Sequence, residues 1–365
     1  MTCGVLANLD VEAVATGRPL PTVLAHRLAA VGTLLRVFSE PDEPLWTPEA
    51  VASHRVLPVE GLAQPRLVSG AEERPTAPRV AWCAHENSNL LSRFFDFCCE
   101  NEQLSRLVGT RWINSLEALR DGLHEDVFAE RAEWLLKPDF SAAGRGALRG
   151  RGEALLDGTL LENSPAISSL FAADSRGGGQ LRGALLEPWV DRLSDFGCRA
   201  RAIGGRVEIE GLHRLLVTPS GGFRGVVVTP GGGIPPGLRN DESKQLVASA
   251  KAAGIRLLAN GYEGPFGVDA FAYRSQSGER RFRAQCELNV RMTFGFVAAA
   301  LVARLGPRQA WDTKLPVALR FGAGPVPKSA SIPLLAPDDT GSHGGKHGNT
   351  TSAWLEPVLD SAYFV

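Results

Sequence analysis

Lysine is scarce in this 365-residue sequence, and net charge is almost absent. Only six of the 39 basic residues are lysines, which leaves 33 arginines, and the 40 acidic residues bring the formal net charge to −1. Such a chain has no excess positive field for a nucleic-acid backbone or for an anionic membrane surface. We therefore expect neither nucleic acid nor membrane as a partner.

Cysteine and long apolar runs are also limited. The six cysteines include no C-x-x-C pair, and the neighbouring Cys98 and Cys99 are poorly placed for a structural disulfide. The longest apolar run, from Phe294 to Ala303, has ten residues, whereas a membrane-spanning helix needs about 20. The first residues do not resemble a secretory signal. We expect reduced thiols and a cytoplasmic location.

The order of apolar and turn-forming segments predicts an α+β chain in three parts. Residues 1–86 form a small α/β domain, 87–327 the main domain, and 328–365 a tail that is in part loosely ordered. Apolar periodicity and capping residues predict helices over Val23–Phe38, Leu90–Glu100, Ser115–Leu123, Asp241–Ala253 and Thr293–Leu305. We expect strands over Val80–Cys83, Trp134–Lys137, Gly183–Val190, Val268–Tyr273 and Arg281–Asn289, a β-rich stretch from 198 to 228, and a Gly-rich loop from Ser141 to Gly152.

The most informative polar residues lie on the hairpin over 268–289. Glu287, Asn289 and Arg291 recur at a period of two, which puts them on one face of a strand. A turn centred on Gly278 would pair Asp269 with Glu287, although a different loop length would shift this register by one residue. Paired side chains lie ~4.5–5.5 Å apart at Cβ, so the two carboxylates need a cation such as Mg²⁺. Arg291 indicates a second anion there, such as a phosphate. A solvated strand face carrying one ion pair is the alternative.

A second set of residues suits a polyphosphate. Lys137 ends an apolar strand, and Ser141, Gly144, Arg145 and Gly146 follow in the Gly-rich loop, which offers backbone N–H groups and further donors. The pattern is not a Walker A loop, because G-x-x-x-x-G-K-[ST] is absent from the chain. A flexible surface loop is the alternative.

The same loop contains a weak dinucleotide-type pattern. Gly144, Gly146 and Gly150 form G-x-G-x-x-x-G, which leaves an NAD(P)-dependent oxidoreductase as an alternative function. The Lys-Pro step and the polar loop that separate these glycines from the preceding strand fit a Rossmann turn badly.

A third segment could hold a flat heterocycle and a sugar. Glu187, Trp189 and Val190 surround a proline, which indicates a strand edge or end with exposed backbone groups. Asp195 could then accept hydrogen bonds from sugar hydroxyls, and Asp191 could do so equally. An ordinary strand leading into a turn is the alternative.

Together and in this order, the three sets resemble the ATP-grasp superfamily of carboxylate–amine ligases, over about residues 87–305. The segments that carry the resemblance are KPDFSAAGRG, LLEPWV, GYEGPFGVDAF and QCELNVRMTFG. The resemblance implies two α+β subdomains that clasp ATP, preceded by a small α/β domain. The second lysine that the superfamily usually has upstream has no counterpart here, because Lys137 is the first lysine in the chain; Arg106 or Arg111 could replace it.

The resemblance also assigns a role to each candidate residue. It implies phosphate contacts from Lys137 and a mobile loop of Ser141, Gly144, Arg145 and Gly146 over the phosphates. The adenine would bind at Glu187, Trp189 and Val190, and Asp195 would contact the ribose. Asp269, Glu287 and Asn289 would be ligands of Mg²⁺ or Mn²⁺, and Arg291 would stabilise the acyl phosphate. A substrate carboxylate, small or peptide, would form an acyl phosphate with release of ADP, and an amine or amino acid would displace the phosphate.

Two further points remain open from the sequence. A homo-oligomer is compatible with this interpretation, and so is a catalytically silent ATP-binding or scaffold protein of the same fold. His343 and His347 have i, i+4 spacing, but the Gly-Gly-Lys between them argues against a helical metal site.

Overall fold

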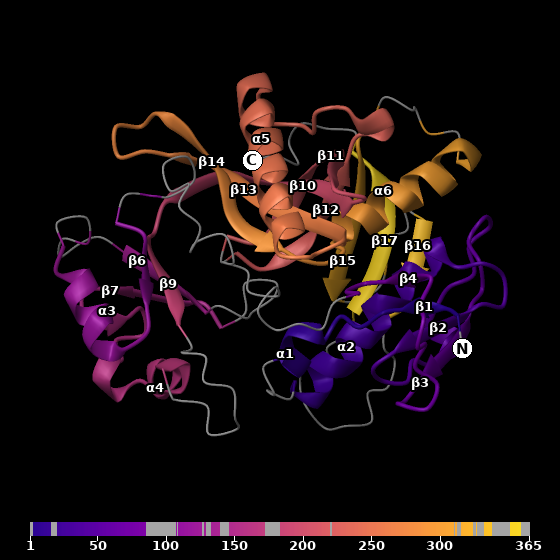
Figure 1. The fold of residues 1–365 in the computed structure, drawn as a ribbon, viewed down its shortest axis with the longest axis horizontal. Helices are drawn as coiled ribbons and strands as arrows, with labels where there is room; N and C mark the ends of the chain where they lie inside the picture. Colours follow the sequence, from indigo (N-terminus) through magenta and orange to yellow (C-terminus); the bar gives the residue numbers. More distant parts are fainter. Residues whose placement is uncertain are drawn as a thin grey trace.

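The computed structural model describes three β-sheets and the helices that cover them (Figure 1). The described residues are 3–15, 20–84, 107, 109–125, 128, 133–138, 146–171, 183–219, 221–309, 311, 315–323, 326, 332–337 and 351–358. Short 3₁₀ segments occur at Thr33–Phe38, Ser53–Arg55, Leu161–Asn163, Pro230–Gly232 and Gly306–Arg308. Within this part of the chain, no helix is both long and apolar enough to span a membrane.

The N-terminal part is a small parallel α/β unit, as the sequence predicts. Its sheet has the order β3-β2-β1-β4, with β1 (Val5–Leu6), β2 (Pro44–Thr47), β3 (Arg66–Ser69) and β4 (Val80–Ala81). The helices are α1 (Val11–Ala15) and α2 (Thr22–Gly32). The helix expected to run to Phe38 ends as an α-helix at Gly32 and continues as a 3₁₀ segment.

The five-stranded sheet lies apart from the N-terminal unit, at the left of Figure 1. Its antiparallel order is β5-β9-β6-β7-β8, with β5 (Arg111–Ile113), β6 (Glu133–Pro138), β7 (Leu148–Arg151), β8 (Ala154–Leu155) and β9 (Ala184–Pro188). Helices α3 (Leu116–Leu123) and α4 (Pro165–Phe171) pack on a core that includes Trp134, Leu136 and Leu186. As expected, Ser115 caps α3, because its Oγ accepts a hydrogen bond from the backbone N of Ala118 at 3.0 Å.

One expectation about this sheet is wrong, and another is met by one of its two alternatives. The Gly-rich loop was expected to run to Gly152, but residues 148–151 form β7, in which Gly150 pairs with Trp134. A Cβ at Gly150 would lie 2.1 Å from the Trp134 ring, so this glycine allows close packing within a ladder. Pro188 ends a strand, as one of the two expected positions, but β9 lies between β5 and β6 and not at an edge.

The largest sheet is antiparallel and has eight strands in the order β14-β13-β10-β11-β12-β15-β17-β16. These are β10 (Asp191–Ile203), β11 (Arg206–Val217), β12 (Phe223–Val228), β13 (Gly264–Arg274), β14 (Arg280–Asn289), β15 (Val317–Ala323), β16 (Ile332–Leu335) and β17 (Thr351–Pro357). Strands β16 and β17 lie in the segment expected to be loosely ordered in part, and the sequence did not predict them. The domain boundaries at 86 and 327 stay predictions.

Two helices cover this sheet. Helix α5 (Asn240–Ala259) packs on β10, β13 and β14 through a core that includes Leu246, Phe266 and Leu288. It was expected to end at Ala253 but continues through Gly254, where a Cβ would lie 2.7 Å from the methyl groups of Val207. Helix α6 (Phe294–Leu305) forms as expected and shares a second core with β12, β15, β17 and α2.

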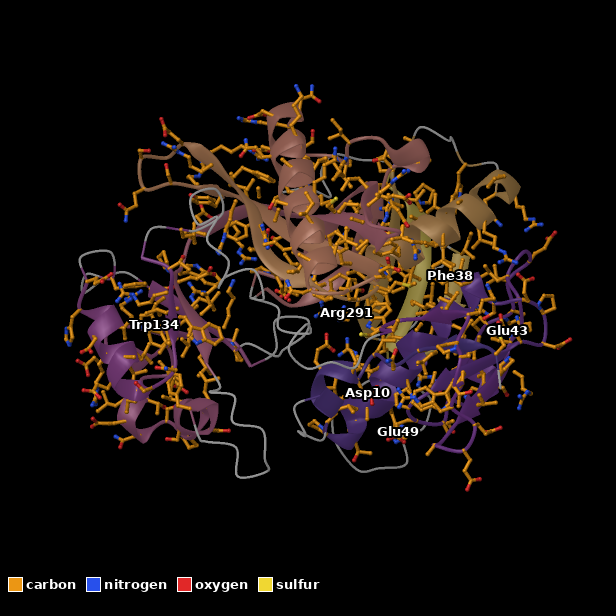
Figure 2. The ribbon with its side chains drawn as sticks, viewed as in Figure 1. Asp10, Phe38, Glu43, Glu49, Trp134 and Arg291 are labelled. Atoms are coloured by element: carbon orange, nitrogen blue, oxygen red, sulfur yellow. The ribbon has the colours of Figure 1, made fainter. Side chains whose placement is uncertain are left out.

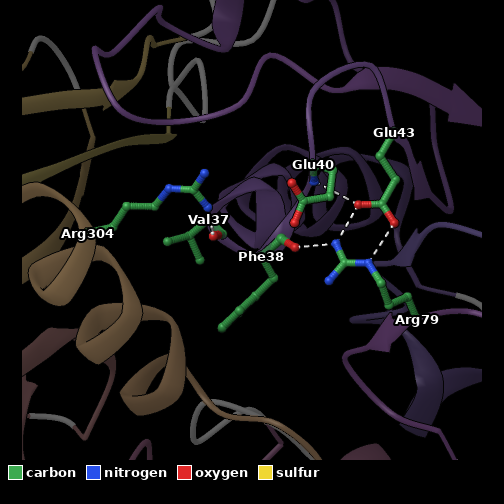
Figure 3. Close-up of polar contacts among 6 residues, drawn as sticks. All are labelled: Val37, Phe38, Glu40, Glu43, Arg79 and Arg304. Carbon is green, nitrogen blue, oxygen red and sulfur yellow. Dashed lines mark hydrogen bonds and ion pairs between the residues drawn. The ribbon is translucent and has the colours of Figure 1, made fainter.

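Polar contacts join α6 to the N-terminal unit (Figure 3). Arg304 donates from Nη1 to the carbonyl oxygen of Val37 at 2.8 Å. Arg304 Nε also donates to the carbonyl oxygen of Gly61 at 2.8 Å. Within the N-terminal unit itself, Arg79 donates to the carbonyl oxygen of Phe38, and its Nε lies 3.0 Å from Oε1 of Glu43. The N-terminal unit is therefore held against the large sheet by both apolar packing and hydrogen bonds.

Candidate functional site

The β13–β14 hairpin places Asp269 directly opposite Glu287, as the sequence predicts, but the route to that register is different. Near the turn Arg274 pairs with Arg280, so the ladder is centred on residue 277, and a regular continuation would place Gln285 opposite Asp269. An irregularity between Phe271–Arg283 and Asp269–Glu287 gives β14 four residues where β13 has two. This bulge restores the expected pair.

The hairpin has one apolar and one polar face. Val268, Leu288 and Val290 pack in the core beneath α5. Asp269 and Glu287 therefore lie on the opposite face, together with Asn289, whose Nδ2 donates to Oδ2 of Asp269 at 3.1 Å. The structure thus brings together the three residues that the sequence proposes as metal ligands.

The electrostatics of this face favour a cation. Burial raises the pKa of Asp269 to about 7, and the adjacent Glu287 carboxylate contributes to that rise. The hydrogen bond from Asn289 and the charge of Arg291 offset part of it. Among the described residues there is no group of three or more His, Cys, Asp or Glu side chains placed to hold a metal ion. A cation here would depend on two carboxylates and one amide, and this oxygen-rich set fits Mg²⁺ or Mn²⁺.

Arg291 follows β14 and contacts the N-terminal unit. Its Nε donates to Oε1 of Glu12 on α1, its Nη1 donates to the carbonyl oxygen of Met292 at 3.3 Å, and its Cζ lies 5.4 Å from the centre of the Trp82 ring. Burial alone would lower the pKa of Arg291, but the charges of Glu12 and Glu287 outweigh this effect. The pKa is raised overall, so the guanidinium stays charged. Figure 2 shows Arg291 in the middle of the molecule, close to α1.

Lys137 lies at the end of β6 in a buried ion-pair cluster. Its Nζ is 2.6 Å from Oε2 of Glu187 on β9, and the other carboxylate oxygen of Glu187 contacts Nη1 of Arg283 on β14. Lys137 Nζ also donates to the carbonyl oxygen of Cys286 at 3.4 Å. Burial raises the pKa of Glu187, but Arg283 and Lys137 outweigh it and lower the pKa to about 2.

The segment proposed as the adenine site is held in place by contacts with β6 and β7. The backbone N of Trp189 donates to the carbonyl oxygen of Glu133 at 2.7 Å, and the Arg149 guanidinium lies 3.6 Å from the centre of the Trp189 ring. Val190 is partly buried between β9 and β10. The Glu187 side chain is turned into the ion-pair cluster and is therefore not available to a base.

Of the two acids proposed for the ribose, Asp195 lies closer to the site. It is buried on β10, its Oδ1 is 2.7 Å from Nη1 of Arg192, and its charge contributes to the raised pKa of Asp269. Burial raises the pKa of Asp195 itself, and Arg192 offsets part of that rise. Asp191 is exposed at the start of β10, with its Oδ2 3.5 Å from Nε of Arg274.

Several predicted residues lie outside the described residues: Arg106, Ser141, Gly144, Arg145, His343 and His347. Gly146 is exposed and has a φ of +70°, a conformation that favours glycine. Arg111, a candidate for the second lysine, lies on β5 and pairs with Glu125. Sequence reasoning missed Glu12 and Trp82, because each reaches the site from a distant segment and has no local motif. It also missed Arg283, which lies on β14 itself but contacts Glu187 of another sheet.

No protein-family model matches the sequence, and no curated protein sequence matches it either. The fold, in contrast, matches several solved structures. An ADP complex of N5-carboxyaminoimidazole ribonucleotide synthetase is 12% identical, with a TM-score of 0.53 over 99% of this chain and 93% of that chain. The Staphylococcus aureus N5-carboxyaminoimidazole synthetase complexed with ADP is 10% identical, with a TM-score of 0.51 over 100% of this chain and 96% of that chain.

The biotin carboxylase domain of the Hydrogenobacter thermophilus 2-oxoglutarate carboxylase, in complex with MgADP, ADP and bicarbonate, is also similar. It is 11% identical to this chain, with a TM-score of 0.56 over 98% of this chain and 86% of that chain. At these identities the similarity concerns the fold alone.

Proposed function

Because the chain has the ATP-grasp fold, we propose that it is an ATP-dependent carboxylate–amine ligase. The observation that carries this proposal is the pair of facing carboxylates, Asp269 and Glu287, on the polar face of β13–β14. The hydrogen bond from Asn289 to Asp269 and the position of Arg291 two residues after the end of β14 support it. A chain that kept the fold for packing alone would have no use for two repelling acids on this face.

The nucleotide would bind along the face that carries these acids. Lys137 would bind the phosphates, with Ser141, Gly144, Arg145 and Gly146 over them. The backbone of Glu187, Trp189 and Val190 would take the adenine, and Asp195 the ribose hydroxyls. The buried position of Asp195 near Asp269 favours it over Asp191.

Asp269, Glu287 and Asn289 would hold the divalent cation. A bound Mg²⁺ or Mn²⁺ would screen the negative charge of the phosphate oxygens. The residues fit this role, because their oxygens suit a hard cation and because a cation would favour the ionised form of Asp269, whose pKa is raised by burial and by the Glu287 charge.

The reaction needs an anion held beside the γ-phosphate. Arg291 would bind the attacking substrate carboxylate and then stabilise the charge of the acyl phosphate. The carboxylate oxygen attacks the γ-phosphorus and ADP leaves; the amine then attacks the acyl carbon, phosphate leaves, and an amide forms after loss of the amine proton. The Gly144/Gly146/Gly150 alternative loses support, since Gly150 lies in an antiparallel strand and not in a strand-to-helix turn.

The test is a screen for ADP release from Mg-ATP with pools of carboxylates, including bicarbonate, and of amines and amino acids, followed by mass spectrometry of the product. We expect at least one acid to stimulate ADP release and an amide to appear when its amine partner is present. ATP binding without stimulated release by any pool would contradict ligase activity and favour a silent nucleotide-binding protein.

A further inference from the structure

The short connection between β14 and α6, which carries Arg291, lies against the N-terminal unit. The backbone N of Met292 donates to the carbonyl oxygen of Trp82 at 2.7 Å, just after the end of β4. The next residue, Cys83, has its Sγ 3.8 Å from the carbonyl oxygen of Val290. The N-terminal unit therefore fixes the backbone on both sides of Arg291.

The Arg291 side chain is held by the same unit. Its Nε donates to Oε1 of Glu12 on α1, its Nη1 donates to the carbonyl oxygen of Met292, and the Trp82 ring lies beside the guanidinium. Both members of the ion pair are mostly buried, with exposed side-chain fractions of 11% for Arg291 and 13% for Glu12. A long side chain loses rotational freedom when its orientation is fixed, so these contacts have to offset that cost.

Glu12 and Trp82 come from different elements, and Asn8 joins them. Asn8 lies between β1 and α1 and is buried; its Nδ2 donates to the carbonyl oxygen of Cys83 at 3.0 Å, and its Oδ1 accepts from the backbone N of Cys83 at 3.1 Å. This reciprocal pair of hydrogen bonds fixes the start of α1 relative to the end of β4. Glu12 and Trp82 therefore contact Arg291 from one connected surface.

These contacts leave the terminal edge of the guanidinium. Arginine has five N–H donors in one plane; one on Nε goes to Glu12 and one on Nη1 goes to Met292, and the described residues accept from no other donor of Arg291. The remaining donors, on Nη1 and Nη2, can bind a carboxylate through two parallel hydrogen bonds. Asp269 and Glu287 interact electrostatically with Arg291, which places this edge beside the proposed metal site.

We propose that Glu12 is a positioning residue for Arg291 and that the N-terminal unit thereby completes the binding site for the substrate acid. By accepting from Nε, the Glu12 carboxylate holds the guanidinium so that its terminal edge is presented to that acid. This inference rests on the proposed function, in which Arg291 binds the acid. It predicts that Glu12 affects the reaction through Arg291 and does not affect the binding of ATP.

The test is a double-mutant cycle on ADP release from Mg-ATP. The carboxylate pools of the ligase screen are diluted until the wild-type rate is proportional to acid concentration, so that the rate reports kcat/KM for the acid. Glu12→Ala removes the acceptor and should lower this rate roughly ten- to hundredfold. Glu12→Gln keeps an uncharged acceptor and should lose less.

The cycle is completed with Arg291→Met. In that background neither change at Glu12 should lower the rate further, because no guanidinium is left to position. The dissociation constant of Mg-ATP, measured by isothermal titration calorimetry, should be the same in the wild type and in both Glu12 variants. The matched control is Glu73→Ala, which removes an exposed acid paired with Arg66 in the same unit and should leave the rate unchanged.

Three results would overturn the inference and leave the proposed function standing. A faster rate in Glu12→Ala would show that Glu12 competes with the acid for Arg291. An unchanged rate would show that Arg291 needs no such partner, and equal losses with and without Arg291 would show a role in folding alone. If Glu12→Ala does not fold, Glu12→Gln decides in the same cycle. A wild type whose ADP release no pool stimulates would overturn both proposals.

Discussion

Asp269 and Glu287 face each other across β13 and β14 on the side of the sheet away from α5. Burial and the Glu287 charge raise the pKa of Asp269 to about 7, so the pair gains from a cation between its oxygens.

We expect Asp269→Asn and Glu287→Gln each to abolish ATP turnover with little loss of fold, because each removes one anionic ligand without changing volume. The measurement is the rate of ADP release with an active substrate pool, with circular dichroism as the check on folding. Glu279→Gln, which changes an exposed acid near the hairpin turn, should have no effect. Wild-type-like turnover in both site variants would remove the metal assignment.

A second prediction concerns Arg291, whose Nε contacts Glu12. Arg291→Met should lower substrate-stimulated ADP release about 10²–10³-fold, as for the loss of a donor to a developing oxyanion. It should change the affinity for ATP much less, since Arg291 is proposed to bind the acid and not the nucleotide. Steady-state kinetics together with ATP titration separate the two effects. An equal loss of ATP affinity would place Arg291 on the nucleotide instead.

The third prediction is the pH dependence of the Glu187 cluster. The pKa of Glu187 in the folded protein, about 2, lies below the usual 4.5, so its ionised form stabilises the folded state above pH ~4.5 and this contribution is lost as the pH falls toward ~2. Glu187→Gln should therefore lower the melting temperature most at neutral pH, and the difference from the wild type should shrink below pH ~4.5. A difference that stays constant from pH 7 to pH 3 would show that the carboxylate charge is not the cause.

The fourth prediction concerns Gly254 within α5. Glycine in a helix normally costs about 1 kcal/mol relative to alanine, but a Cβ here would lie 2.7 Å from Val207 and 2.8 Å from Phe266. Gly254→Ala should therefore lower the free energy of unfolding by about 1–3 kcal/mol. The exposed Ala248→Gly in the same helix should lose about 1 kcal/mol from propensity alone. Urea denaturation measures both, and stabilisation by Gly254→Ala would show that the helix and β11 separate easily.

Local patterns in the sequence predict much of this fold, because strand alternation and helix caps act over a few residues. The polar face of β13–β14 follows from the period of two, and Ser115 caps α3 as its sequence context indicates. The bulge in β14 could not be predicted, since nothing local indicates that three residues of β14 lie opposite one residue of β13 between consecutive ladder pairs. From the sequence we expect α5 to end before Gly254, because glycine usually follows a helix end. In the structure Gly254 lies inside the helix and allows it to pack closely against Val207 of β11.

The parts of the site that were missed depend on tertiary contacts. Glu12 reaches Arg291 from a helix 279 residues away in the chain, and Arg283 reaches Glu187 from another sheet. A single sequence does not show that these residues, far apart in the chain, lie close together in the fold. Strands β16 and β17 were hidden because the glycine- and histidine-rich segment between them dominates the local composition.

The central claim is that ATP binds with a divalent cation held by Asp269 and Glu287. Calorimetric titration of ATP into the wild type and into the Asp269→Asn/Glu287→Gln double variant, each with and without Mg²⁺, tests it most directly. We predict that Mg²⁺ strengthens ATP binding to the wild type and has little effect on the double variant. Equal dependence on Mg²⁺ in both proteins, or no binding of ATP by the wild type, would contradict the account.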